Sequence, residues 1–384
     1  MTTLTPPTAG RSGDRSGGSG QDGPTSGAGT PGGRPRAVAR ALVSRVGLLG
    51  GLLLLLLGAG LASAAVGQFP IPPSEVLGSV LHRLGLDLGP LPTHPQAENS
   101  LWNVRFPRVV MTAVVGAALA TAGALMQGVF GNPLAEPSVV GVSAGAAVAA
   151  AAVIVFSLDF LGPWTIAACA FAGGLVTTLL VYVMARDNGR TEVVTLVLTG
   201  IAINAVANAG LAFLLFLADT SSREEIVFWT LGSFNGSRWA EVQVALPIAA
   251  VGVGLSLLLA RQLDLLALGD RAARHVGVDV ERLRLVCIGL VALLTAVGVA
   301  FCGVIAFVGL VVPHLIRLVA GPGHRLLVPA SALAGAALLV LADLWARTAI
   351  TSADLPIGML TSLIGGPFFF WLLRRARRTA GGWA

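Results

Sequence analysis

Lysine is absent from this sequence of 384 residues, which carries its positive side-chain charge on 25 arginines. A phosphate-binding Walker loop needs a lysine, and so does a catalytic Schiff base. Neither site can exist in this chain. If ATP drives this protein, a separate subunit must bind it.

Charged residues are also scarce. They make up 11% of the sequence, whereas hydrophobic residues make up 55% and the mean hydropathy is +0.82. A soluble domain carries about 25% charged residues, so this composition cannot cover a surface that faces water. Lipid must be the solvent for most of the chain, and we expect an all-α integral membrane protein.

Cysteine is represented by three residues, Cys169, Cys287 and Cys302, each inside an apolar run. Their spacing shows no disulfide framework and no zinc-ligand pattern. We expect them to be small buried hydrophobic residues, and we expect no cofactor bound to this chain.

Apolar segments of membrane-spanning length, about 20 residues, dominate the rest. They lie at 46–66, 109–130, 138–158, 162–185, 193–217, 242–260, 326–342 and 355–373. A further run at 285–316 has 32 residues without a charge, which is too long for one upright span. Gly298 and Gly303 offer a turn within it, so we predict two helices there and ten transmembrane helices in total.

The ends of the chain differ from this pattern. Residues 1–40 are rich in Gly, Ser, Thr and Pro and are predicted to be a disordered cytoplasmic tail. The uncharged run at 46–66 is longer than the apolar region of a signal peptide, about 7–15 residues, so we expect a retained first helix. The ten-helix domain is predicted over 41–378, with a short C-terminal tail at 379–384.

The arginines test this count, because cytoplasmic loops carry an excess of them. With ten spans and a cytoplasmic N-terminus, 19 of the 25 arginines fall inside and six outside; with nine spans the split is 14 against 11. This favours ten spans with both termini in the cytoplasm. The dominance of Gly, Ala and Arg indicates a bacterial source, and hence a bacterial cytoplasmic membrane.

The cytoplasmic loop at 263–284 contains a predicted two-turn helix that could serve as a docking surface for a soluble partner. We expect Asp270 to cap its start, Gly277 to end it in a left-handed conformation, and Asp279 to cap the next helix. A solvated connecting loop is the alternative. The residues expected to matter are Leu268, Gly269, Asp270, Ala273, His275, Gly277 and Val278.

Gly200, Asn204 and Asn208 are spaced four residues apart and share one face of the fifth predicted span. Amides at membrane depth are costly unless they are paired or face water. They are therefore predicted either to line a translocation pathway or to form hydrogen bonds between helices.

Several dense motifs occur in a fixed order over roughly residues 40–378, and with them the chain resembles the permeases that import ferric siderophores, haem and cobalamin with an ATP-binding cassette subunit. The loop at Leu268-Gly269 is one of them. The others are Arg105-Phe106-Pro107-Arg108, Gly123-Ala124-Leu125-Met126-Gln127-Gly128, Asn132-Pro133-Leu134-Ala135-Glu136-Pro137, Gly141-Val142-Ser143-Ala144-Gly145-Ala146, Phe307-Val308-Gly309-Leu310-Val311-Val312-Pro313-His314 and Leu355-Pro356-Ile357-Gly358.

This resemblance implies a type II ABC importer permease: a homodimer in membrane lipid with ten helices per subunit, two ATP-binding cassette subunits at the cytoplasmic loop, and an extracytoplasmic substrate-binding protein, in this case a lipoprotein. No nucleic acid is expected as a partner. In the family, arginines that match Arg105, Arg108 and Arg347 pair with the binding protein. The alternatives are lipid headgroups for Arg105 and Arg108, and pairing with Asp343 for Arg347.

The cargo is predicted from resemblance alone. The segments 228–233 and 321–331 are more similar to haem permeases than to cobalamin permeases, which favours haem, followed by a ferric siderophore, with cobalamin as the alternative. A secondary transporter driven by ions is the rival function. Such proteins keep ionisable groups near the bilayer midplane, whereas Asp159 and Asp343 lie at span ends and Glu136 lies in a short loop.

Overall fold

The computed structural model describes residues 33–187, 190–350 and 353–379. Residues 44–384 form one compact unit, and residues 1–43 form a separate one. Most of the predicted N-terminal tail and of the C-terminal tail lies outside the described residues. The first helix nevertheless begins at Gly33, before the boundary predicted at residue 40.

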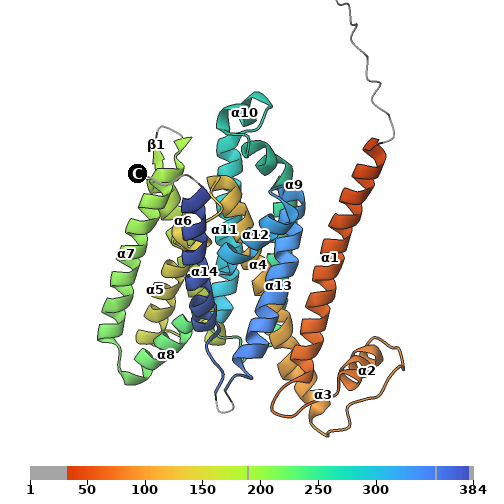
Figure 1. Ribbon diagram of the computed structural model, residues 1–384. Coiled ribbons are helices and arrows are strands. Elements are labelled where there is room, and N and C mark those ends of the chain that lie inside the picture. The colour runs from red at the N-terminus through yellow and green to blue at the C-terminus, as the bar shows by residue number, and fades with distance from the viewer. Residues whose placement is uncertain (1–32, 188–189, 351–352, 380–384) are drawn as a thin grey trace, which may run out of the picture. The chain divides into compact units, whose positions relative to one another are not determined.

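Helices account for most of the described chain (Figure 1). The ten apolar ones are α1 (Gly33–Ala65), α4 (Phe106–Phe130), α5 (Val142–Val155), α6 (Thr165–Met184), α7 (Val193–Leu217), α9 (Trp239–Leu266), α11 (Val280–Cys302), α12 (Val308–Ala320), α13 (His324–Ala346) and α14 (Ile357–Thr379). The expected all-α architecture is therefore confirmed.

Eight of these helices are long and apolar enough to cross a membrane. The other two, α5 and α12, have 14 and 13 residues, too few for an upright crossing of a hydrocarbon core of about 30 Å. They occupy the positions of the third and eighth predicted spans, so the structure supports eight full spans and two shorter apolar helices.

The long uncharged run is divided as expected, but only one of the two proposed glycines makes the turn. Gly303 ends α11 with a positive φ of 69°. Gly298 lies inside α11, so its assignment to a turn is wrong: a glycine whose surroundings are helical on both sides continues the helix at a modest cost.

Helix α4 lies at the centre of the unit, packed against α13, α11, α9 and α12. Glycines make this close packing possible. A Cβ atom on Gly116 would lie 2.3 Å from the carbonyl oxygen of Gly335 in α13, and one on Gly123 would lie 1.8 Å from that of Gly309 in α12. Small residues let helix backbones approach in this way.

Shorter elements lie at the two ends of the bundle (Figure 1). At one end are α10 (Asp270–His275) and a two-stranded antiparallel pair, β1 (Arg186–Asp187) with β2 (Arg190–Thr191). At the other end are α2 (Pro73–Arg83), α3 (Ala97–Ser100) and α8 (Thr220–Leu231). The loops predicted to be cytoplasmic thus lie at one end.

Candidate functional site

The predicted docking helix is α10, a short helix in the connection from α9 to α11. Gly269 and Gly277, on either side of it, have φ values of 100° and 87°, which L side chains rarely adopt. The backbone N–H of Arg282 donates a hydrogen bond to Asp279 (3.0 Å), so Asp279 caps α11 as predicted. The left-handed conformation predicted at Gly277 is also confirmed.

The prediction that Asp270 caps α10 is wrong. Gly269 occupies the cap position, and no side chain caps this helix. Asp270 is the first helical residue, and its carboxylate accepts two hydrogen bonds from Nη2 of Arg284 in α11, both at 3.0 Å. The carboxylate of Asp270 thus binds the guanidinium group of Arg284 instead of a backbone N–H of α10, because hydrogen bonds between charged groups are the stronger ones.

Arg284 also ties the β1–β2 hairpin to the same place. Its Nη1 donates to the backbone carbonyl oxygen of Thr191 (3.2 Å), and the backbone N–H of Thr191 donates to Glu281 (3.0 Å). The side chain of Arg284 is only 10% exposed. Asp270 and Arg284 therefore form one anchor that joins α10, α11 and the hairpin, which the sequence alone did not indicate.

The loop around α10 has two faces. Ala273 and Val278 are buried, at 0% and 9% exposure, whereas Leu268 and Val276 are 71% and 61% exposed. His275 is exposed, with its Nδ1 2.7 Å from the backbone carbonyl oxygen of Arg271. Part of this loop is thus fixed in the protein, while the exposed apolar side chains that flank the helix are free to contact a partner.

At the opposite end of the bundle, Arg105 is buried, at 6% exposure. Its guanidinium group donates hydrogen bonds to the backbone carbonyl oxygens of Ala64 (2.7 Å), Ala65 (3.1 Å) and Phe69 (2.6 Å). It closes the C-terminal end of α1, whose last carbonyl groups have no partner within the helix. It does not reach outward to lipid headgroups.

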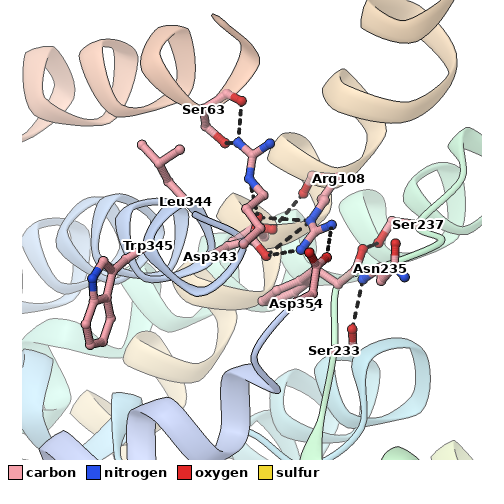
Figure 2. A network of polar contacts seen from close by, with 12 residues as sticks. Ser63, Arg108, Ser233, Asn235, Ser237, Asp343, Leu344, Trp345 and Asp354 are labelled. Atoms are coloured by element: carbon pink, nitrogen blue, oxygen red, sulfur yellow. Dashed lines mark hydrogen bonds and ion pairs between the residues drawn. The ribbon is translucent and has the colours of Figure 1, made fainter. Parts of the chain in front are cut away.

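Arg108 forms the centre of a polar network shown in Figure 2. Its Nη2 lies 2.9 Å from Asp343 Oδ1 and its Nη1 lies 2.9 Å from Asp354 Oδ2. Asp343 is 3% exposed in its side chain, and Asp354 is 38% exposed. Two carboxylates that lie 235 and 246 residues further along the chain therefore hold one arginine at the start of α4.

Arg347, just after α13, joins the same network. It donates hydrogen bonds to the hydroxyl (2.7 Å) and backbone carbonyl oxygens of Ser63 and to the carbonyl oxygen of Val66 (2.9 Å). Its Nε lies 3.7 Å from Asp343 Oδ2, so the alternative of an i,i+4 pair is confirmed. The pair is longer than the one that Asp343 makes with Arg108.

All three arginines predicted to dock a binding protein thus have partners within the chain. The contacts of Arg105, Arg108 and Arg347 link the end of α1 to α4 and α13, with hydrogen bonds and ion pairs of 2.6–3.0 Å. Their role in docking stays a prediction. A binding protein could accept hydrogen bonds only from those guanidinium N–H groups that are not already used within the chain.

Of the predicted pathway residues, two contact the segment before α5. A Cβ atom on Gly200 would lie 1.9 Å from the carbonyl oxygen of Val139, and Nδ2 of Asn204 donates to the carbonyl oxygen of Ser138 (3.2 Å). The hydrogen-bonding alternative therefore holds for Asn204. Asn208, two turns from Gly200, is exposed, so only this residue is left facing outward.

Glu136, which was predicted to lie in a short loop, makes a hydrogen bond inside the bundle. Glu136, before α5, accepts a hydrogen bond from the backbone N–H of Phe307 (2.8 Å), at the first turn of α12. Pro137 packs closely against Gly309 in α12. A Cβ atom added to Gly309 would lie 2.9 Å from Cδ of Pro137. The segments that lead into the two short helices thus meet, and a negative charge lies at a helix N-terminus, where it is favourable.

Among the described residues, no group of three or more His, Cys, Asp or Glu side chains could hold a metal ion. His324, which starts α13, is buried and has its Nδ1 2.9 Å from Asp264 Oδ1. This contact is structural.

Residues 53–375 match the sequence model of the FecCD transport family. The chain belongs to this family. It is 45% identical over 272 residues to the cobalamin import system permease protein BtuC of Halobacterium salinarum, covering 71% of this chain and 72% of that protein. It is 43% identical over 286 residues to the hemin transport system permease protein HmuU of Yersinia pestis, covering 73% and 85%.

A solved structure assigned to the metal-chelate type of ABC transporter, in an inward-facing conformation, has the same fold. The two chains are 31% identical and superpose with a TM-score of 0.75, covering 85% of this chain and 98% of the other. The FecCD chain described here is therefore a multi-pass transport permease and not an enzyme, as predicted. The relatives carry names for two different cargoes, so the preference for haem is not confirmed.

Proposed function

We propose that this chain is the membrane-spanning subunit of an ABC importer, and that an ATP-binding cassette subunit docks on the α10 loop of each permease. The observation that carries this proposal is the two-faced geometry of α10. Asp270 and Arg284 anchor it to α11, while Leu268 and Val276 are exposed. A partner that pushes on the exposed face would move α10, α11 and the hairpin as one body.

The rest of the assembly follows from the same proposal. The functional unit is a homodimer in a bacterial cytoplasmic membrane, with ten spans per subunit and both termini in the cytoplasm. Support for a second subunit comes from α7. Only 11% of the residues in its most apolar stretch are buried within one chain. Asn208 lies on that helix among exposed apolar residues, and we propose that it faces the pathway, whereas Gly200 and Asn204 hold α7 against the segment before α5.

At the other end of the bundle, we propose that a substrate-binding lipoprotein docks near Arg105, Arg108 and Arg347. Support comes from the elements that carry them: α4 begins and α13 ends at the end of the bundle opposite α10 (Figure 1). We expect the double change Arg105→Glu with Arg108→Glu to weaken binding of that protein in a pull-down at moderate salt. Because both arginines have internal partners, a melting curve must first show that the variant is folded, and unchanged binding by a folded variant would contradict the docking role.

The proposed cargo is an iron complex, with haem favoured and a ferric siderophore next. Cobalamin is the alternative, and the two named relatives support haem and cobalamin about equally, at 43% and 45% identity. Spectroscopic titration of the cognate binding protein with haem, a ferric siderophore and cobalamin would decide among them. Tight binding of cobalamin alone would overturn the iron assignment.

Coupling is tested at Gly277. Proline cannot adopt the φ of 87° found at Gly277, because its ring fixes φ near about −65°. We expect Gly277→Pro, reconstituted with its ATPase in proteoliposomes, to hydrolyse ATP while uptake of cargo is lost. Gly254→Ala in α9 is the matched control, since nothing lies within 4 Å of its added Cβ atom. Wild-type uptake by the Gly277 variant would refute the coupling role of the loop.

A further inference from the structure

A hollow of about 530 Å³ opens where the start of the apolar part of α1, the end of α9 and the turn between α12 and α13 come together. Arg45, Arg261 and Arg325 line it, and Leu265 and Leu326 supply apolar surface. It lies outside the α10 loop and outside the arginine network at the other end of the bundle.

The charge in this hollow is unbalanced. Within the described part of the chain, none of the three arginines makes a hydrogen bond or ion pair, and all three are exposed. The one carboxylate in the lining, Asp264, accepts a hydrogen bond from the backbone N–H of His324 (2.6 Å), and its Oδ1 lies 2.9 Å from His324 Nδ1. Three guanidinium groups therefore share a concave site with one carboxylate that is already occupied.

The level of the hollow along the helices indicates its ligand. Arg45 is the first residue of the apolar span of α1, which runs to Ala65. Arg261 lies in the last turns of α9, and Arg325 is the second residue of α13. Three apolar helices thus present a cation where each leaves the hydrocarbon, which is the depth at which lipid phosphates lie.

The adjoining surface suits acyl chains. On α1, helical spacing places Val46, Leu53 and Leu57 on one stripe beside Arg45, and they are 64%, 46% and 61% exposed. Only 11% of the most apolar stretch of that helix is buried. A ligand held by the arginines could therefore extend apolar chains along α1. A free phosphate ion would make no use of this surface, and neither would an acidic side chain of a soluble partner.

We propose that this hollow binds the phosphate group of an anionic glycerophospholipid, with its acyl chains lying along α1. Arginine suits this ligand because its planar fork donates two parallel hydrogen bonds to phosphate oxygens. Basic pockets between transmembrane helices on the cytoplasmic side bind anionic headgroups in this manner. The proposal rests on the membrane location of these helices and is independent of the cargo.

The test is native mass spectrometry of the detergent-purified full chain with added phosphatidylglycerol, cardiolipin, phosphatidylcholine or inorganic phosphate. We expect phosphatidylglycerol and cardiolipin to remain bound where phosphatidylcholine does not. In Arg261→Gln with Arg325→Gln, we expect phosphatidylglycerol binding to weaken by about thirtyfold, the loss expected for two arginines near an anionic surface.

The matched control is Arg186→Gln with Arg282→Gln, which removes two exposed arginines outside the hollow; its lipid binding should equal that of the wild type. Equal loss in both double variants would overturn the proposal, as would equal binding of phosphatidylcholine. Competition by millimolar inorganic phosphate would assign the hollow to a free anion instead. Loss of the bound lipid on assembly with the ATPase subunits would assign it to protein contact.

Discussion

The two ends of the bundle use arginine in opposite ways. At the end that carries α2 and α8, Arg105, Arg108 and Arg347 are held by internal carbonyl and carboxylate oxygens. At the end that carries α10, one arginine, Arg284, is buried in an ion pair, while others such as Arg261 are exposed and make no hydrogen bond or ion pair within the described residues.

This difference separates arginines that hold helices together from arginines that make no such contact within the described part of the chain. Buried ion pairs hold their geometry because a lone charge in a low-dielectric interior is strongly unfavourable. Exposed charges contribute little to stability and remain available for contacts with other molecules. The exposed arginines at the end with α10 are therefore available to a partner, whereas Arg105, Arg108 and Arg347 form a structural clamp, and a protein that docks there would meet side chains that also hold the fold together.

The clamp is most exposed to disruption at Asp343, which serves both Arg108 and Arg347. We expect Asp343→Asn to destabilise the protein by about 3 kcal/mol, because two arginines whose side chains are only 14% and 11% exposed lose their most buried counter-charge. Thermal unfolding in detergent would measure this. Asp354→Asn is the control, expected to cost less than about 1 kcal/mol because the carboxylate of Asp354 is 38% exposed. Equal effects of the two variants would show that Asp343 is not the carboxylate on which the clamp depends.

A smaller effect is expected at Asp270, whose carboxylate is 40% exposed. Asp270→Asn should cost about 1 kcal/mol in stability, yet it should lower cargo transported per ATP hydrolysed, because α10 loses its tie to α11. Paired uptake and hydrolysis assays in proteoliposomes would show this. Asp279→Asn removes a charge from the same loop but keeps an N-cap of equal quality, so its coupling should stay normal. If the Asp270 variant transported a normal amount of cargo per ATP hydrolysed, the contact between Asp270 and Arg284 would not be needed to transmit motion from α10 to α11.

The smallest effect is expected at Asp219, an exposed cap at the start of α8. Hydrogen bonds from Ser222 lower the pKa of this carboxylate. The cap therefore contributes above the unfolded pKa, and its contribution is lost as the pH falls through the folded pKa. Hydrogen exchange, corrected for intrinsic rate, should show protection of the Ser222 amide falling below about pH 4. In Asp219→Asn this protection should be independent of pH, and a matching acid loss there would contradict the assignment.

Local signals in the sequence predicted much of the fold. Apolar segments indicated the ten apolar helices, and the capping residue Asp279 and the left-handed Gly277 were identified from spacing alone. Asp270 was misassigned because its partner in α11 outweighs the local backbone. Gly298 was misassigned because a glycine in an apolar run gives no sign of whether the helix continues.

The polar contacts of the site could not be predicted in the same way. Arg108 and Asp343 are 235 residues apart, and Glu136 and Phe307 are 171 residues apart. No periodicity or capping rule joins such positions. Each of these side chains could equally have faced lipid headgroups, water or a partner. Only the packing of α4, α13 and the two short helices determines which partner each side chain meets.

The central claim is that this permease has no energy source of its own and is driven through the α10 end by a separate ATPase. The most direct measurement is cargo uptake by proteoliposomes that contain the purified chain with and without its ATP-binding cassette subunits. We predict uptake only when those subunits and ATP are both present. Uptake by the permease alone, driven by a proton or sodium gradient, would contradict the account.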